Sequence, residues 1–517
     1  MDNSVESPEA EAVPVANPAP PEVTAPSRRL SPALKRTVVA SVAGCAVLGG
    51  VLVLLPDGDV QGPPALPGPA GRAVIAASAG APAALPDLTA LIGEREAELR
   101  KNPRDDRTWA ALGAAYVERG TRTADAAYYS KAEQALRSSV KARPKGNVEA
   151  LDGLAALAAA RGDWRAAKNW GEAARKLAPE RWSTYSGLVA AYQGVGDYKA
   201  AGRSLDKLSE LASGTAVTLR TAAVYRDRGW REDAAAVLSD ATARAGTPTE
   251  QAALLHRAGD LAWERGEAAD ALRHFDAALA ADPQFPAALA GRGRALASLG
   301  RTADAVRAYQ HALIKRPAPE YALELGELYE SMNLDAEARA HYDALRARVA
   351  AQGAHGVDDA LVLGLFEADH GDPEAAVERL RAEWKRAPGI AAADALGWAL
   401  HRAGEDDEAI GLLRRATDRQ KGGTVRSALY SYHLGAAERE MGLYGAARRH
   451  IGEALRINPA FSPLLAPQAR EALSALGDPP EGGPEQMWPP QPKAAAPARK
   501  PAAPARKPSQ PPAPKRR

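Results

Sequence analysis

Apolar and polar positions follow a helical period over most of the chain, and the pattern restarts at regular intervals. A glycine marks nearly every restart, at spacings of 33, 34, 37 or 38 residues. Glycine, and to a lesser degree asparagine, tolerates the left-handed conformation that often ends a helix. The pattern therefore predicts repeated pairs of helices, each pair joined by a tight turn at Gly162, Gly196, Gly229, Gly266, Gly300, Asn333, Gly371, Gly404 and Gly442.

Three further positions keep the same register. Five residues after each turn there is an alanine, which lets two helices approach closely. Nine residues after it there is usually a large apolar residue: Leu205, Leu238, Phe275, Tyr309, Tyr342, Leu380, Leu413 or Ile451. Seven residues before it, six units carry a second glycine: Gly259, Gly293, Gly326, Gly364, Gly397 and Gly435. Prolines such as Pro283 and Pro388 follow the second helices and end them, because proline cannot continue a helix.

The first unit contains the motif W-x2-L-G-x2-Y at Trp109, Leu112, Gly113 and Tyr116. This motif resembles the opening of a tetratricopeptide repeat, which has a period of 34 residues. The resemblance implies a superhelix of about ten helix-turn-helix units, an α-solenoid, from about residue 106 to residue 459. A helix over 85–101 is expected before the units, and a capping helix over 467–476 after them. About seven extra residues near 121–128 interrupt the first unit.

Residues 37–55 form an uncharged stretch of 19 residues, TVVASVAGCAVLGGVLVLL. At 1.5 Å per residue it is just long enough to cross a hydrocarbon core of about 30 Å. Basic residues precede it and Asp57 and Asp59 follow it, which places the N-terminus in the cytoplasm and the helical array outside. Two alternatives remain open: a cleaved signal peptide, with small-residue cleavage sites near 76–79, and lipid attachment at Cys45.

Composition divides the rest of the chain. Residues 1–36 are predicted to be a disordered cytoplasmic tail, 56–84 a Pro/Gly/Ala linker, 85–477 the array with its flanking and capping helices, and 478–517 a disordered basic tail rich in proline and alanine. After Glu485 there are eight Lys or Arg residues and no acidic one. The tail is either a solubilising extension or a segment attracted to anionic lipid or wall polymers. Its single aromatic residue, Trp488, argues against specific nucleic-acid binding.

The expected fold class is thus all-α: a tetratricopeptide superhelix with one N-terminal transmembrane helix and disordered termini. The nine histidines are scattered and none forms H-E-x-x-H. No nucleophile elbow, phosphate-binding loop or strand-borne dinucleotide fingerprint is present. We therefore predict no catalytic residue, no cofactor and no metal site.

The resemblance also implies that the first helix of each unit lines a concave groove, so that partner-facing residues recur at fixed offsets from the turn. The candidates at those offsets are His256, Asp260, Trp263, Glu264, Arg294, Glu327, Glu330, Trp398, His401, Arg402, Tyr432 and Arg439. For Trp263 and Trp398 the alternative is packing between units. The function expected is a non-catalytic, membrane-anchored scaffold that binds partner proteins in the groove. The alternative is a substrate-recruiting accessory subunit of an envelope enzyme or transporter.

Overall fold

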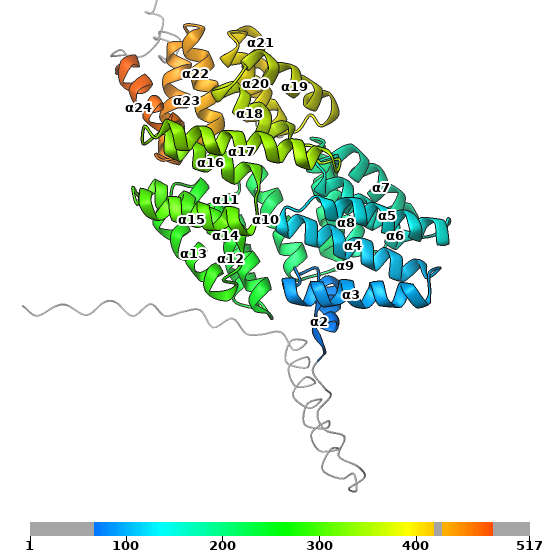
Figure 1. Ribbon diagram of the computed structural model, residues 1–517. Coiled ribbons are helices and arrows are strands. Elements are labelled where there is room, and N and C mark those ends of the chain that lie inside the picture. The colour runs from blue at the N-terminus through cyan, green and yellow to red at the C-terminus, as the bar shows by residue number, and fades with distance from the viewer. Residues whose placement is uncertain (1–66, 418–425, 479–517) are drawn as a thin grey trace, which may run out of the picture. The chain divides into compact units, whose positions relative to one another are not determined.

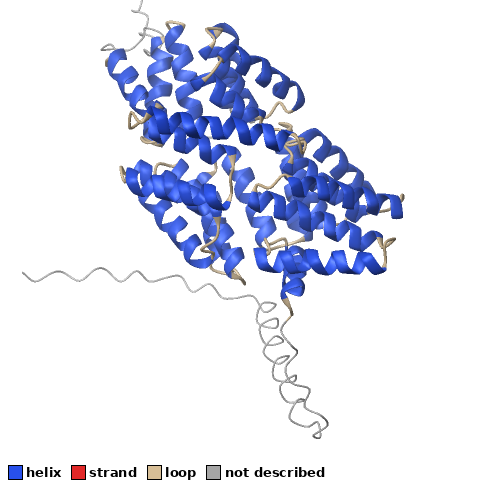
Figure 2. Ribbon diagram, viewed as in Figure 1, coloured by secondary structure: helices blue, strands red, loops and turns tan. Residues whose placement is uncertain are grey.

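The structure is a computed structural model, and it describes residues 67–417 and 426–478. Within these ranges the chain forms 23 helices, α2–α24, and no strand (Figures 1 and 2). Helices α2 (Pro69–Ala79) and α3 (Leu85–Lys101) pack together and precede ten helix pairs, and α24 (Leu465–Leu476) follows them. The prediction of an all-α array of about ten units, with a helix on either side, is confirmed for these residues.

Each unit consists of a first helix and a second helix that pack along one another. The first helices are α4 (Asp106–Thr123), α6 (Val148–Ala160), α8 (Trp182–Gly194), α10 (Thr215–Asp227), α12 (Pro248–Glu264), α14 (Pro286–Ser298), α16 (Pro319–Glu330), α18 (Ala360–His370), α20 (Ile390–Arg402) and α22 (Ala428–Glu440). The second helices are α5 (Ala127–Ala142), α7 (Trp164–Leu177), α9 (Tyr198–Leu211), α11 (Arg231–Thr242), α13 (Ala268–Ala281), α15 (Thr302–Lys315), α17 (Asp335–Gly353), α19 (Pro373–Arg386), α21 (Asp406–Thr417) and α23 (Tyr444–Ile457).

The turns inside the units have the predicted left-handed backbone with one exception. Asn333 has φ 59°, and seven of the eight predicted glycines also have positive φ. Gly371 has φ −138° instead, so the prediction is wrong there. Its amide closes α18 on the carbonyl of Glu367, and the next residue, Asp372, caps α19 from an extended conformation.

The second glycine of a unit and its large apolar residue are two halves of one contact. A Cβ atom on Gly259 would lie 2.6 Å from the ring of Phe275, and one on Gly364 would lie 2.6 Å from Leu380. Real Cβ atoms essentially never come so close to another heavy atom, so only glycine lets the large side chain reach the first helix. Where Gly171 stands in place of the large residue, Leu188 of the next unit fills the space.

The N-terminal linker prediction is wrong for the part of 56–84 that the structure describes. Residues 69–79 form α2, which begins with a proline and ends at Gly80 with φ 68°. Asp87 of α3 accepts a hydrogen bond of 3.0 Å from Arg72 of α2, and Ala73 is buried. An alanine-rich segment suggests a spacer, but it also forms a helix readily when another helix packs against it. In the first unit, the extra residues lengthen α4, which ends at left-handed Ala124.

Several predicted segments lie outside the described residues. These are the tail 1–36, the transmembrane helix 37–55, the linker up to residue 66, and residues 479–517 of the basic tail. Among the helices that the structure describes, none is both long and apolar enough to span a bilayer.

Hydrogen bonds also join distant parts of the array. The Asn458 side-chain amide donates to the Trp263 carbonyl over 195 residues of sequence, and the Ile390 amide donates to the Tyr198 hydroxyl over 192 residues, each at 2.8 Å. The Asp358 amide donates to the Arg161 carbonyl, also at 2.8 Å. Each bond connects the turn region inside one unit to the connection that follows a second helix much later in the chain. We call these three bonds the long-range contacts.

Candidate partner-binding face

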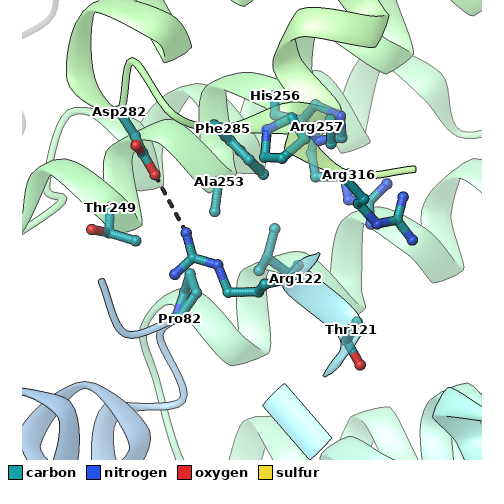
Figure 3. A pocket seen from close by; sticks show the side chains of 13 residues that line it. Pro82, Thr121, Arg122, Thr249, Ala253, His256, Arg257, Asp282, Phe285 and Arg316 are labelled. Carbon is teal, nitrogen blue, oxygen red and sulfur yellow. Dashed lines mark hydrogen bonds and ion pairs between the residues drawn. The ribbon is translucent and has the colours of Figure 1, made fainter. Parts of the chain in front are cut away.

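Three of the cavities in the described part of the chain border first helices at the offsets predicted for the groove. The first cavity, about 360 Å³, is lined by residues of α4, α10, α12 and α14, and Figure 3 shows it from close by. The second cavity, about 810 Å³, is bordered by α4, α10 and α12 and by residues 80–82. The third cavity, about 630 Å³, lies between α12–α18 and the segment from α22 to α24. We call the side of the first helices that borders these cavities the inner face.

Ion pairs cross the inner face from unit to unit. Arg226 of α10 contacts Glu264 of α12 at 2.8 Å. Arg294 of α14 contacts Asp260 of α12 at 3.5 Å and Glu324 of α16 at 2.9 Å. These partners belong to successive units, so the network fixes the stacking of units as well as the polarity of the face.

The network continues with aromatic residues toward the C-terminus. His370 of α18 lies 3.1 Å from Glu330 and 3.8 Å from Glu327 of α16. Trp398 of α20 donates its Nε1–H to Asp369 at 3.1 Å and stacks on His433 of α22, with ring centroids 4.1 Å apart. His433 lies 3.0 Å from Asp394. Polar side chains thus bridge every pair of neighbouring first helices from α16 to α22.

Burial shifts the pKa values of several of these groups. It lowers the pKa of His256 to about 4, with only partial compensation from Asp260, so this ring is neutral at pH 7. Burial also raises the pKa of the Glu327 carboxyl. For His370, burial alone would lower the pKa, but the nearby carboxylates of Glu327 and Glu330 raise it. The arrangement favours charge pairing and proton sharing within the wall.

Six of the predicted groove residues border the cavities: His256, Asp260, Trp263, Glu264, Arg294 and Glu327. The other six are Glu330, Trp398, His401, Arg402, Tyr432 and Arg439. Trp398 is only 2% exposed and Tyr432 only 6% exposed, so neither can meet a partner in this conformation. For Trp398 the alternative of packing between units is correct. His256 borders the first cavity but is itself 9% exposed, and it packs against Phe275 and Phe285.

The last four candidates contact other residues of the array: Arg402, Glu330, His401 and Arg439. Arg402 lies 3.4 Å from Asp369, and Glu330 accepts a hydrogen bond from Tyr342. His401 lies 2.6 Å from Asp406 of its own unit. Arg439 pairs with its neighbour Glu440 at 2.9 Å. These four residues are less buried than Trp398, and none of them borders the three cavities.

One further offset places side chains at the cavities, although it is not among those predicted from the sequence. The position nine residues before the turn holds Arg220, Arg257, Glu324 and His433, and all four border a cavity. Other units have glycine, alanine or valine at that position, which hid the pattern. Arg122 and Arg316 lie outside the offsets and could not be found by them. Within the described ranges, no group of three or more His, Cys, Asp or Glu residues is arranged to hold a metal ion.

Comparison with known proteins agrees with this architecture. The tetratricopeptide repeat family matches residues 256–310, 291–354 and 361–424. The three matched segments, which lie within the helical array, are similar to tetratricopeptide repeats. Such repeats act as protein–protein interaction scaffolds and typically not as enzymes. No curated protein is significantly similar in sequence.

Solved structures show limited likeness. A tetratricopeptide repeat protein from Parabacteroides merdae aligns with 50% of this chain and 98% of its own, at 16% identity and a TM-score of 0.30. Human IFIT1, solved as a dimer with PPP-AAAA, aligns with 72% of this chain and 89% of its own, at 16% identity and a TM-score of 0.39. The APC/C hetero-tetramer Cut9–Hcn1 aligns with 78% of this chain and 94% of its own, at 14% identity and a TM-score of 0.29. At such low similarity, the ligands of those proteins have no bearing on this chain.

Proposed function

We propose that this protein is a non-catalytic scaffold that binds a partner chain on the inner face of its tetratricopeptide array. One observation carries the proposal: cavities and charged side chains follow the same side of successive first helices, on elements that the repeat holds in place. A partner that meets preformed helices loses little ordering free energy from the scaffold side. The partner chain then contributes most of the conformational cost.

The test uses a photoreactive amino acid in the intact chain, placed at Leu365 on the inner face. The matched control places it at Ile314 on α15, which is 78% exposed and borders none of the three cavities. After irradiation of intact cells and mass spectrometry, we expect a specific adduct from position 365 and none from position 314. Equal adducts from both positions, or an adduct only from position 314, would contradict inner-face binding.

We propose further that residues 37–55 anchor the protein in a membrane, with the N-terminus in the cytoplasm and the array outside. The support is the uncharged stretch and the asymmetry of basic residues around it. A reporter fused after Gly477 that is active only outside the cytoplasm is the expected result. Activity of that fusion inside the cytoplasm would reverse the orientation.

The basic tail is proposed to add a weak electrostatic contact with anionic lipid or wall polymers. Its eight positive charges and lack of acidic residues support this. Contacts of this kind fall off over a Debye length of about 8 Å at physiological salt, so we expect binding to anionic vesicles to fall steeply with salt. A full-length variant with the eight basic residues replaced by glutamine should sediment less with the vesicles at low salt. Equal sedimentation would leave the tail a solubilising extension.

A further inference from the structure

Arginine side chains are concentrated around the first and second cavities. The two cavities share Pro82, Thr121, Arg122, Leu219 and Arg257 in their walls, so they adjoin along one stretch of the inner face. Five arginines line them, against four acidic residues: Arg122, Arg220, Arg226, Arg257 and Arg316, and Glu118, Asp260, Glu264 and Asp282. Figure 3 shows Arg122 pointing toward Asp282, with Arg257 and Arg316 among the other side chains that line the first cavity.

Three of these arginines have carboxylate partners. Arg226 pairs with Glu264 at 2.8 Å, Arg257 with Asp260 at 3.2 Å, and Arg122 with Asp282 at 3.4 Å. Each guanidinium carries five donors, and these pairs use only some of them. The other two arginines, Arg220 and Arg316, have different hydrogen-bond partners.

Arg220 has no carboxylate partner among the described residues; its Nε–H donates to the Ser186 hydroxyl at 3.3 Å. Burial and the neighbouring charge of Arg257 lower its pKa, although a guanidinium stays protonated in proteins. Arg316 donates to the Tyr321 hydroxyl at 3.1 Å, and its Nε is buried without a hydrogen-bond partner in the described part of the chain. Burying charge without full pairing costs free energy that a bound anion would recover.

A segment of the chain itself already binds to this wall through its backbone. Residues 81–84, between α2 and α3, are not helical; Ala81 and Pro82 line the second cavity, and Pro82 also lines the first. The Ala83 amide donates to Glu118 at 2.8 Å, and Arg122 donates to the Ala83 carbonyl. Glu118 and Arg122, one turn apart on α4, thus bind both backbone polar groups of a single non-helical residue. The wall is therefore suited to hold backbone as well as side chains.

Apolar side chains line the walls together with the arginines, including Leu219, Phe285 and Pro286. We propose that the first and second cavities together bind an extended segment of the partner chain in which acidic residues alternate with apolar ones. Its carboxylates would pair with Arg220, Arg257 and Arg316, because the planar guanidinium matches a carboxylate in a bidentate geometry. This inference rests on the proposed scaffold function and names the chemistry of its partner.

A nucleic-acid strand is disfavoured by the same lining. Binding of single strands relies on a series of exposed aromatic faces, and Phe285 is the only Phe, Tyr or Trp in the two walls. The buried ring of His256 lies behind it. Alternating acidic and apolar side chains of a peptide use both features of the wall.

The test measures binding of fluorescent peptides to the full-length protein by anisotropy at low salt. One peptide of twelve residues alternates glutamate with leucine and alanine, and its twin has glutamine in place of glutamate. We expect the acidic peptide to bind and the glutamine twin to bind far more weakly. R220Q should weaken the acidic peptide roughly tenfold or more, which is typical for loss of a hydrogen bond to a charged group. R220K should retain part of the affinity because it keeps the charge.

The control variant is R273Q, since Arg273 on α13 is 72% exposed and, among the described residues, forms an ion pair only with Asp270. It should bind the acidic peptide as the unmodified chain does. The inference is overturned if both peptides bind alike, if R220Q binds as tightly as R273Q, or if inorganic phosphate binds more tightly than the acidic peptide. If R220Q still yields the adduct from position 365, the scaffold function survives and only this inference fails. If neither the unmodified chain nor any variant yields the adduct from position 365, the scaffold function itself is contradicted.

Discussion

At the residue scale, the inner face shows how a repeat array accommodates buried charge. Arg294 sits between Asp260 and Glu324, and each of those acids belongs to a neighbouring unit. Removing one member would leave an unpaired charge, which is more damaging than replacing the whole group by apolar residues. Such residues are thus poor candidates for free partner contacts even though their offsets in the sequence are right.

His256 makes the stability of the array sensitive to acid. Its pKa is about 4 in the folded protein, chiefly because of burial, and about 6.5 in an unfolded chain. The unfolded state therefore binds the proton first as pH falls. The contribution to stability is complete above pH 6.5 and lost as pH falls toward 4, with a magnitude of about 3 kcal/mol.

We expect H256F to reduce this loss, because phenylalanine cannot be protonated and suits a site beside Phe275 and Phe285. Urea unfolding at pH 7.5 and pH 4.5 measures the free energy of unfolding at both ends of the window. The control is H311F at an exposed histidine, which should leave the difference between the two pH values unchanged. An unchanged difference in H256F as well would show that this ring does not carry the effect.

Asp359 changes the stability of the array with pH in the opposite direction to His256. Burial, with the nearby Glu320 and Asp358, raises the pKa of its carboxyl to about 6, and its Oδ2 is buried without a hydrogen-bond partner among the described residues. The unfolded chain releases this proton near pH 3.9, so stability falls as pH rises from about 4 to about 6 and stays lower above that. We expect D359N to be more stable at pH 7.5 by about 1 kcal/mol, a value reduced for partial exposure, and unchanged at pH 4. Thermal melts at the two pH values check this, and an equal gain at both would contradict the titration argument.

At the scale of the element, the paired glycine and large apolar residue define each helix hairpin. In α18, a Cβ on Gly364 would meet Leu380 of α19 at 2.6 Å. Leu380 is fully buried, so it has nowhere to move without disturbing the unit. The tightness of the hairpin comes from these two positions together, and either position alone would be uninformative.

G364A is accordingly expected to destabilise the protein by about 1–3 kcal/mol, since an added methyl group overpacks a filled contact. The matched control is G452A in α23, where a Cβ would meet nothing within 4 Å. There the better helix propensity of alanine should stabilise by about 0.5–1 kcal/mol. Chemical denaturation followed by circular dichroism compares the two. Stabilisation by both substitutions would refute the packing account of the second glycine.

Most of the elements could be predicted from sequence because their causes are local. The helix over 85–101 was predicted at its observed bounds, and the turn residues followed from left-handed backbone requirements. Helix α2 was missed because an alanine-rich segment reads as a spacer unless its packing surface is known. The site was predicted less well. Trp398 occupies a groove offset but is buried by His433, and the identity of a residue on the next unit cannot be read from a fixed offset.

At the scale of the whole array, the long-range contacts distinguish this protein from a stack held only by neighbours. In a purely nearest-neighbour array, units can unfold in segments, because each contacts only the next. Here Asn458 bonds to Trp263, and Tyr198 bonds to Ile390. Such pairs lie far outside one repeat, so the 34-residue periodicity could not have predicted them. They couple early units to late ones and should make unfolding more cooperative.

Y198F tests this coupling with the loss of one oxygen atom. The Ile390 amide would lose its acceptor at a buried residue, which costs about 1–3 kcal/mol. We expect a lower midpoint in urea and a shallower transition, since the two halves of the array would separate before either unfolds completely. The control is Y225F on α10, because the Tyr225 hydroxyl has no hydrogen bond in the described ranges; its effect should be within about 0.5 kcal/mol. If Y198F and Y225F unfold with the same midpoint and slope, the long-range contacts do not contribute to cooperativity, and the array behaves as a chain of neighbours.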